Sequence, residues 1–220
     1  MKTVIFTDSC CDLSIDYVRE NNIEVMPLTV NINSTYVTDD LGQSIKHKDF
    51  YDLIRRGEMP STSTVNAFAF EEKFREYVNN GYSIIYIGFS SALSGCVNSA
   101  NIAKGIVEDD IKDADITVVD TKSASLGLGL LVYKASEMLK NGANKEDIVN
   151  CLEKNKLKVK HWFTVDDLNH LKRGGRVSST SAVVGTLLSI KPIMNVSDEG
   201  KLTPVAKVKD RKKSIKHLQQ

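Results

Sequence analysis

Apolar residues along the chain fall into short continuous runs that alternate with amphipathic stretches. The runs at residues 2–7, 83–88 and 115–120 are nearly unbroken and rich in β-branched side chains, which is typical of strands buried on both faces. Apolar residues recur at helical spacing in four stretches, at residues 66–79, 96–107, 124–140 and 145–154. Strands that alternate with helices predict an α/β fold in which helices cover a parallel sheet.

The strand at 83–88 passes abruptly into a turn of small residues and hydroxyls, here named the hydroxyl turn (residues 90–95). Ser91 or Ser94 in this turn would cap the helix that begins near Cys96. Open α/β sheets bind ligands at the carboxyl ends of their strands, and free N–H groups at a helix start favour an anion. The hydroxyl turn is therefore the first candidate for a binding site.

A second cluster of hydroxyl residues, here named the hydroxyl loop (residues 61–64), precedes the helix at 66–79. Thr64 or Asn66 would cap that helix, and capping alone explains one such cluster. Two clusters at one edge of a sheet point to a shared ligand. Neither cluster contains a lysine or an arginine, so a singly charged or neutral acceptor such as a carboxylate suits them better than a polyphosphate.

The segments before the hydroxyl loop are less regular. Residues 23–32 are predicted to form one strand, which Pro27 confines to a sheet edge or a bulge. A short strand is expected at 36–37 and a helix at 48–56. The stretch from 57 to 66 is predicted to be a loop.

The alternation of strands and helices stops near residue 157, and we place a domain boundary there. Residues 1–157 form the first predicted domain and residues 158–220 the second. The second domain is expected to begin with a strand at 161–165 and a short helix capped by Asp166. Its further expected elements are a helix at 182–189, a strand at 190–196, and a strand followed by a helix within 201–220.

The composition is that of a folded protein. The 220 residues are 41% hydrophobic and 26% charged, so a packed core is expected. The net charge of +1 gives no support for binding to nucleic acid or to a membrane surface. No apolar run approaches the roughly 20 residues of a membrane span, and no signal peptide is expected.

Metal and redox chemistry find little support in the sequence. The four cysteines have no metal-binding or redox spacing, which indicates reduced thiols in a cytoplasmic protein. Asp8 and Asp120, at predicted strand ends, are expected to cap helices rather than to bind magnesium. Gly127 and Gly129 lie within a helical pattern, not in the turn that a dinucleotide-binding fingerprint needs. We therefore expect neither a metal nor a cofactor.

One alternative function is serine-based acyl chemistry. Gly88, Ser90 and Ala92 nearly match the Gly-x-Ser-x-Gly nucleophile elbow, with alanine in place of the last glycine. An esterase or acyltransferase would use Ser90, Ser91 or Ser94 together with a histidine. The available histidines are His161, His170 and His217.

A second alternative rests on the basic loop (residues 172–176). Two glycines between Arg173 and Arg176 predict a nest of N–H groups flanked by guanidinium groups, which can hold a phosphate or a carboxylate. A charged surface turn explains the same residues equally well. A regulator that binds a phosphosugar or a nucleotide would use this loop.

Taken together, these motifs resemble those of the DegV family of bacterial fatty-acid-binding proteins. The matching segments run in order along nearly the whole chain, and the set is specific although no single segment is decisive. The segments are Phe6-Thr7-Asp8-Ser9, Val25-Met26-Pro27-Leu28, Thr62-Ser63, Ser90 to Gly95, Val119 to Lys122, Leu168 to Arg176 and Gly185 to Ile193.

The resemblance implies both a fold and a site. It implies a Rossmann-like parallel-sheet domain followed by a smaller α/β domain, which is truncated at Gln220 relative to the family. It implies that Thr62 and Ser94 hold the carboxylate of a long-chain fatty acid, such as palmitate, whose chain lies in a buried tunnel. The other residues expected around the ligand are Ser63, Ser91, Gly95 and Arg173.

The resemblance also implies a role without catalysis. The protein would present the bound acid to a fatty acid kinase, which phosphorylates the carboxylate for phospholipid metabolism. Lys209 departs from the family pattern, since it stands where many members have an arginine and it lacks the bidentate fork of a guanidinium.

Overall fold

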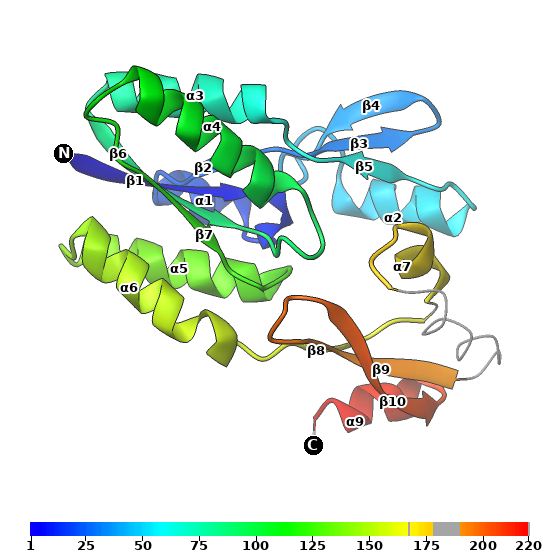
Figure 1. Cartoon of the computed structure of the whole chain (residues 1–220). Helices are drawn as coiled ribbons and strands as arrows, with labels where there is room; N and C mark the ends of the chain where they lie inside the picture. Colours follow the sequence, from blue (N-terminus) through cyan, green and yellow to red (C-terminus); the bar gives the residue numbers. More distant parts are fainter. Residues whose placement is uncertain (167, 178–189, 220) are drawn as a thin grey trace.

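A four-stranded parallel sheet, sheet A, forms the centre of the first part of the chain, as the apolar runs predict (Figure 1). The computed structural model describes residues 1–166, 168–177 and 190–219. In order across the sheet, the strands are β2 (Glu24–Met26), β1 (Lys2–Asp8), β6 (Tyr82–Gly88) and β7 (Ile116–Asp120). All three pairs of neighbouring strands are parallel, and the predicted α/β class is confirmed.

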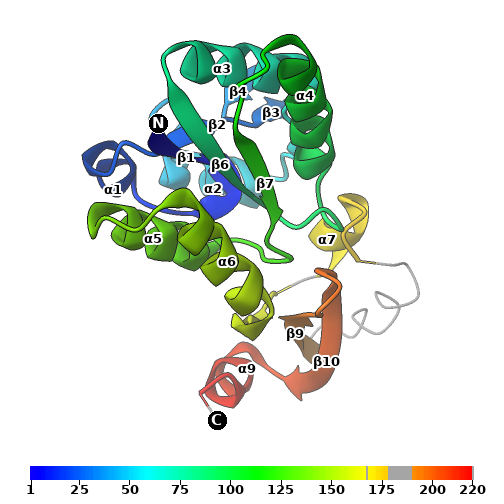
Figure 2. The same ribbon diagram turned by 60° about the vertical axis from the view of Figure 1, so that its left-hand side comes forward.

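Helices cover both faces of sheet A (Figures 1 and 2). On one face lie α3 (Ala67–Asn79) and α4 (Cys96–Asp110). On the other face lie α1 (Ile15–Glu20), α5 (Leu126–Lys140) and α6 (Lys145–Asn155). Strands that are apolar on both sides require this double cover, because both rows of side chains must leave water.

Alternate side chains of β1 and β6 enter two separate cores. Phe6 and Tyr86 pack with the residues of α3 and α4, whereas Ile5 and Ile85 pack with those of α1, α5 and α6. All four side chains are almost completely buried. Burial of a large apolar side chain contributes about 1.5–3 kcal/mol, so these two cores hold the sheet and its carboxyl edge in place.

The expectation of a single strand over residues 23–32 is wrong. The chain leaves sheet A at the end of β2 and continues in a different sheet as β3 (Thr29–Ile32). Pro27 lies at this break. Proline has no N–H group to donate, so it cannot continue the ladder between β2 and β1.

Sheet B is a small antiparallel sheet in the order β4 (Thr35–Thr38), β3 and β5 (Ser61–Ser63). The short strand expected at 36–37 corresponds to β4, and the helix expected at 48–56 corresponds to α2 (His47–Arg55). β5 lies within the stretch predicted to be a loop. Its three residues are all exposed and carry hydroxyl groups, so no apolar alternation marks it as a strand.

A three-stranded antiparallel sheet, sheet C, follows residue 157, and the domain boundary placed there stays a prediction. Its order is β10 (Leu202–Lys209), β9 (Ile190–Val196) and β8 (Trp162–Thr164), and α9 (Arg211–His217) packs against β10 and β9. These elements match the order of strands and helix that the sequence predicts. Two short 3₁₀ helices also occur, η1 (Ser9–Cys11) and η2 (Lys156–Lys158).

The short helix of this region begins later than predicted. α7 (Asn169–Arg173) starts after Leu168, so Asp166 does not cap it as expected. The Asp166 carboxylate lies instead 3.3 Å from the Lys191 amine at the start of β9. A tertiary ion pair has therefore replaced the local cap. The helix expected at 182–189 lies outside the described residues.

Candidate functional site

The hydroxyl loop and the hydroxyl turn come together at the carboxyl edge of sheet A, as the sequence predicts. β5 places the loop by pairing with β3, where Thr62 stands opposite Val30, and the turn follows β6 directly. A side-chain carbon added at Gly95 would lie 3.7 Å from the methyl group of Thr64. The backbone at Gly95 therefore lies next to the Thr64 side chain, with room for little more than a methyl group between them.

The residues predicted to hold a carboxylate differ in their surroundings. Thr62 and Ser63 are exposed on β5, and Ser94 is half-buried. The Ser94 hydroxyl accepts a hydrogen bond from the Cys96 N–H at 3.3 Å. Gly95 occupies the N-cap position of α4, so the prediction of a serine there is wrong. The neighbouring Ser94 hydroxyl nevertheless satisfies one of the free N–H groups of the first turn.

Ser90 ties the hydroxyl turn to the hairpin between β9 and β10. Its buried hydroxyl donates to the Gly200 carbonyl at 2.9 Å and accepts from the Ala92 N–H at 3.3 Å. Gly200 has a φ of 81°, and a side-chain carbon there would lie 2.0 Å from the Ser90 oxygen. Glycine is needed for both reasons. No local pattern in the sequence predicts this bond, because Ser90 and Gly200 are 110 residues apart.

Ser91, Asp120 and Lys122 form a polar cluster between the ends of β6 and β7. The Ser91 hydroxyl donates to the Asp120 carboxylate and accepts from the Lys122 amine at 2.9 Å. Burial disfavours the charged form of Asp120, but hydrogen bonds from Lys122 and Ser91 outweigh it and hold the pKa of this carboxyl below its usual value. The prediction that Asp120 caps a helix is wrong, since it binds the neighbouring strand end instead.

A buried carboxyl group lies beneath the hydroxyl turn. Asp8, at the end of β1, accepts hydrogen bonds from the Phe89 N–H and the Tyr86 hydroxyl, each at 2.9 Å. It also accepts from the Cys10 N–H at 3.2 Å, which confirms its predicted role as a helix cap. Burial raises the pKa of Asp8, and the hydrogen bonds offset this only in part. Asp8 therefore fixes the point at which β6 enters the turn.

A cavity of about 630 Å³ opens beside Thr62. Its walls come from η1 and the turn after it, sheet B, α2 with the loop before it, and the segments that follow β6 and precede α5. The carboxyl of Asp39 also lines it, and burial raises the pKa of that group. Ser94 lies outside its wall. The apolar residues that line the cavity are Leu13, Val30, Leu41, Ile45, Phe50, Tyr51 and Phe89.

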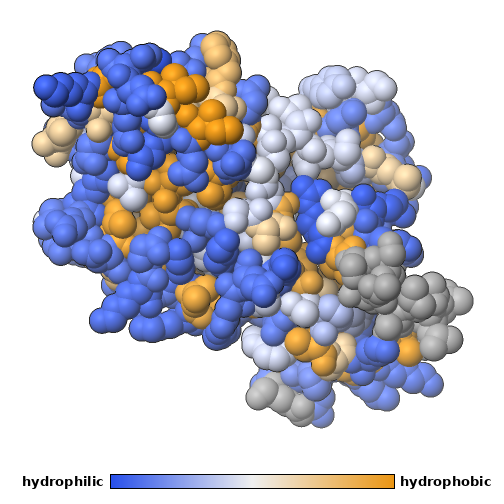
Figure 3. Space-filling model, in the orientation of Figure 1, coloured by the Kyte–Doolittle hydropathy of each residue, from blue (hydrophilic) through white to orange (hydrophobic). Residues whose placement is uncertain are grey.

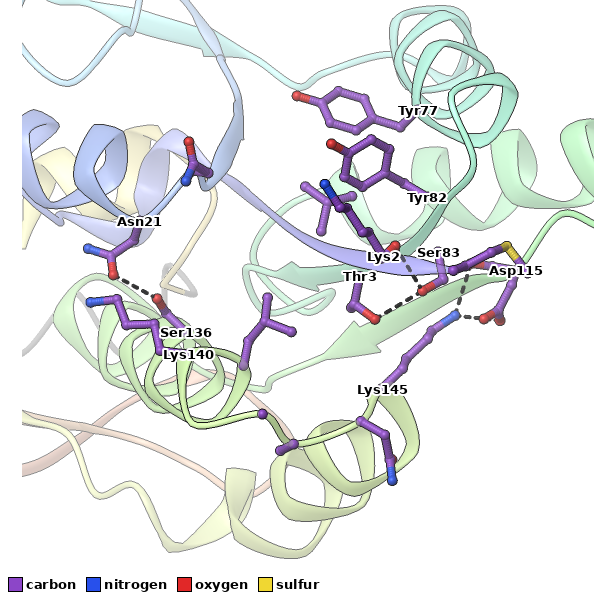
Figure 4. A pocket seen from close by; sticks show the side chains of 17 residues that line it. Lys2, Thr3, Asn21, Tyr77, Tyr82, Ser83, Asp115, Ser136, Lys140 and Lys145 are labelled. Atoms are coloured by element: carbon purple, nitrogen blue, oxygen red, sulfur yellow. Dashed lines mark hydrogen bonds and ion pairs between the residues drawn. The ribbon is translucent and has the colours of Figure 1, made fainter.

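A second cavity, of about 940 Å³, lies at the opposite edge of sheet A, where the strands begin (Figure 4). Many of its polar groups bind one another. The pairs are Thr3 with Ser83 at 3.0 Å, Ser136 with Asn21 at 3.1 Å, and Lys145 with Asp115 at 2.5 Å. Because these polar groups already bind one another, fewer of them are available to a ligand here than at the carboxyl edge of sheet A.

Exposed apolar residues also occur outside both cavities. Figure 3 shows apolar surface over α4, an element on which Ile102 and Ile106 are exposed, with hydrophilic surface around it. A few exposed apolar residues are normal for a folded protein. We therefore assign no site to this patch.

The two arginines of the basic loop have different roles. Arg173, the predicted ligand contact, is exposed, and its guanidinium lies 3.0 Å from Nδ1 of His170. Arg176 reaches the hydroxyl turn, where its Nε–H donates to the Leu93 carbonyl at 3.1 Å. The sequence pattern treats the two arginines alike. Only the tertiary structure shows which one contacts the turn.

The histidines considered for acyl chemistry have other partners. Nε2 of His161 accepts a hydrogen bond from the Ala124 N–H at 3.3 Å. Its ring lies so close to α5 that a side-chain carbon at Gly127 would come 1.9 Å from Nε2, which explains a glycine inside a helical pattern. His170 contacts Arg173, and His217 is exposed on α9.

The free energy of unfolding is expected to depend on the protonation of His161. Burial of the imidazole disfavours its charged form and lowers the pKa of His161. The unfolded chain then binds more protons than the folded one below pH 6.5, so stability should fall as the pH drops from 6.5. Urea unfolding between pH 5 and 8 measures this slope.

His161→Gln should flatten the slope, and His217→Gln, at an exposed position, is the matched control. An equal slope in wild type and His161→Gln would show that other groups cause it.

Within residues 1–166, 168–177 and 190–219, no group of three or more His, Cys, Asp or Glu side chains is arranged to hold a metal ion. All four cysteines have free thiols. No helix in these ranges has both the length and the apolar character needed to span a membrane.

Comparison with known proteins gives a consistent result. The family model described as "Uncharacterised protein, DegV family" matches residues 2–220. A DegV domain-containing protein of Clostridium perfringens is 51% identical over 217 residues, which cover 99% of this chain and 75% of that protein.

Solved structures show the same fold. A stearic-acid-binding protein from Eubacterium ventriosum superposes with a TM-score of 0.89 at 28% identity, covering 98% of this chain and 74% of that one. A fatty-acid-binding DegV family protein from Thermus thermophilus superposes with a TM-score of 0.86 at 31% identity, covering 100% and 76%. The resemblance seen in the motifs is confirmed, and the chain belongs to the DegV family.

Proposed function

We propose that this protein binds a long-chain fatty acid, such as palmitate, with its carboxylate on Thr62 and Ser94. Ser63, Ser91, Gly95 and Arg173 are proposed to surround the head group. The protein would act in the cytoplasm as an acyl carrier that presents the carboxylate to a fatty acid kinase. The observation that carries the proposal is the approach of two hydroxyl-rich segments, one of which contributes Thr62 to the wall of a cavity lined by apolar and acidic side chains.

The energetics of such a complex suit this edge of sheet A. Burial of an alkyl chain contributes about 0.8 kcal/mol per CH₂ group, so the chain supplies most of the affinity. Hydrogen bonds to the charged head contribute about 1.5–3 kcal/mol each and mainly fix its orientation. The start of α4 adds N–H groups that favour a negative charge. The relatives described as fatty-acid-binding proteins support the same ligand class.

The alternatives have weaker support. An esterase needs a histidine beside its serine. The partners found for the three candidate serines are the Gly200 carbonyl, the Asp120–Lys122 pair and Cys96. A phosphate-binding regulator would need free guanidinium groups in the basic loop. The guanidinium of Arg176 is instead engaged by the carbonyls of Leu93 and Gly174.

Palmitate binding by wild type and by the double variant Thr62→Ala, Ser94→Ala tests the proposal. Loss of two hydrogen bonds to a carboxylate should weaken binding at least about tenfold. A displacement titration with a fluorescent fatty acid measures the affinity. Thr35→Ala on the exposed strand β4 is the matched control, and its affinity should equal that of wild type. Equal affinity in wild type and the double variant would contradict the roles of Thr62 and Ser94.

The carrier role needs a separate measurement. Loaded protein, a fatty acid kinase and ATP should yield an acyl phosphate, which hydroxylamine traps as a hydroxamate. A kinase that phosphorylates free palmitate equally well without this protein would contradict the carrier role.

A further inference from the structure

Arg176 links sheet C to the hydroxyl turn across 83 residues of sequence. Its Nε–H donates to the Leu93 carbonyl, and its Nη1 donates to the Gly174 carbonyl. These two bonds hold the planar guanidinium in one orientation. A side-chain carbon at Gly174 would lie 3.4 Å from Nη1, so the loop backbone packs directly against the guanidinium.

The backbone that carries Arg176 is itself anchored. The next residue, Val177, is buried and packs with Leu168 and with Met194 of β9. The side chain of Leu93, at the other end of the link, is also buried. Arg176 therefore joins two fixed points, the segment after α7 that packs against β9 and the hydroxyl turn.

The peptide group that Arg176 holds is the one that leads into Ser94. The Leu93 carbonyl and the Ser94 N–H belong to the same planar unit, so a hydrogen bond to that carbonyl orients the backbone of Ser94. The Ser94 N–H is also fixed, because it donates to the Ser90 carbonyl at 3.1 Å. The guanidinium of Arg173 faces His170 instead.

We propose that Arg176 is a positioning residue, which sets the Ser94 hydroxyl for the ligand carboxylate and so makes head-group affinity depend on the docking of sheet C. This inference rests on the proposed function of Ser94. It gives Arg176 an indirect role through the Leu93 carbonyl, which is separate from the head-group contact proposed for Arg173.

A double-mutant cycle with Arg176→Gln and Ser94→Ala tests the proposal, with palmitate and hexadecanol as ligands. Arg176→Gln should weaken palmitate binding about tenfold, the effect of one lost hydrogen bond to a charged group. In the Ser94→Ala background the same change should alter palmitate binding less than about twofold. Hexadecanol has the chain without the charge, so its affinity should change little. Lys172→Gln, on the exposed side of α7, removes a neighbouring charge as the control.

Arg176→Lys separates position from charge and is the milder variant if Arg176→Gln folds poorly. Lysine keeps the charge but lacks the planar Nε–H, so Arg176→Lys should lose nearly as much palmitate affinity as Arg176→Gln. Wild-type affinity in Arg176→Lys would overturn the positioning role. An equal loss for palmitate and hexadecanol, or an equal loss with and without Ser94, would also overturn it. Failure of the wild-type protein to bind palmitate would count against the proposed function itself.

Discussion

Gly129→Ala is expected to destabilise the protein by about 2 kcal/mol, within the range found for overpacked cores. Gly129 is buried in α5, where the helix crosses η1. A side-chain carbon there would lie 2.4 Å from the Cys11 carbonyl oxygen and 3.3 Å from the Leu13 side chain. The obstacle is a backbone atom of η1, so α5 must move away from η1 to make room for a methyl group.

Gly105→Ala, also within a helix, is expected to change the free energy of unfolding in the opposite direction. Gly105 lies in α4, is exposed, and has no atom within 4 Å of an added side-chain carbon. Alanine should therefore stabilise the protein by about 0.5–1 kcal/mol through helix propensity. Urea unfolding of both variants at 25 °C checks the pair. Similar changes for both variants would show that helix propensity, and not the contact with Cys11, decides the effect at Gly129.

Asp8→Ala is expected to cost about 3 kcal/mol, because its two closest donors, each at 2.9 Å, lose their acceptor in addition to the Cys10 N–H, and each unsatisfied buried group costs about 1–3 kcal/mol. The two closest donors are the Tyr86 hydroxyl and the Phe89 N–H. The Phe89 bond also anchors the start of the hydroxyl turn, so palmitate affinity should fall with stability. Urea unfolding at pH 7 measures the loss. Tyr86→Phe removes one of the two donors, so Asp8→Ala should cost about 1 kcal/mol less in that background.

The pH dependence of Asp8→Asn tests the state of this carboxyl group. Burial raises the pKa of Asp8, so the folded protein holds this proton more tightly than the unfolded chain does. The stability that protonated Asp8 contributes is complete below pH 3.8 and is lost as the pH rises through the folded pKa. The destabilisation caused by Asp8→Asn should therefore shrink with rising pH. A destabilisation that grows with pH would mean that the folded pKa is lowered.

Much of the fold could be predicted from local patterns. The runs at 2–7, 83–88 and 115–120 became β1, β6 and β7, because a strand buried on both faces needs apolar residues at every position. The cap at Asn66 was also local, since its side chain accepts from the Ala69 N–H only three residues away. The rule for strand ends in parallel sheets predicted the place of the hydroxyl turn. The hydroxyl loop is positioned instead by the pairing of β5 with β3 in sheet B.

The two strand assignments that local patterns could not predict, at residues 61–63 and 23–32, have a common cause. β5 carries only exposed hydroxyl residues, and it is a strand because β3 offers it a partner. The run at 23–32 looks like one strand, but a parallel and an antiparallel partner take its two halves into different sheets. Strand formation depends on the neighbouring strand more than on the residues themselves.

The sequence by itself determined the parallel sheet, its helical cover and the two hydroxyl segments at its carboxyl edge. Each of these depends on residues close together in the chain, so periodicity and capping residues reveal them. Only the tertiary structure decided that Gly129 leaves room for the Cys11 carbonyl and that Gly200 leaves room for the Ser90 hydroxyl. It also decided that Arg176 donates a hydrogen bond to the Leu93 carbonyl in the hydroxyl turn. These contacts join residues that are distant in the chain, and a local pattern carries no information about which distant atom a side chain will meet.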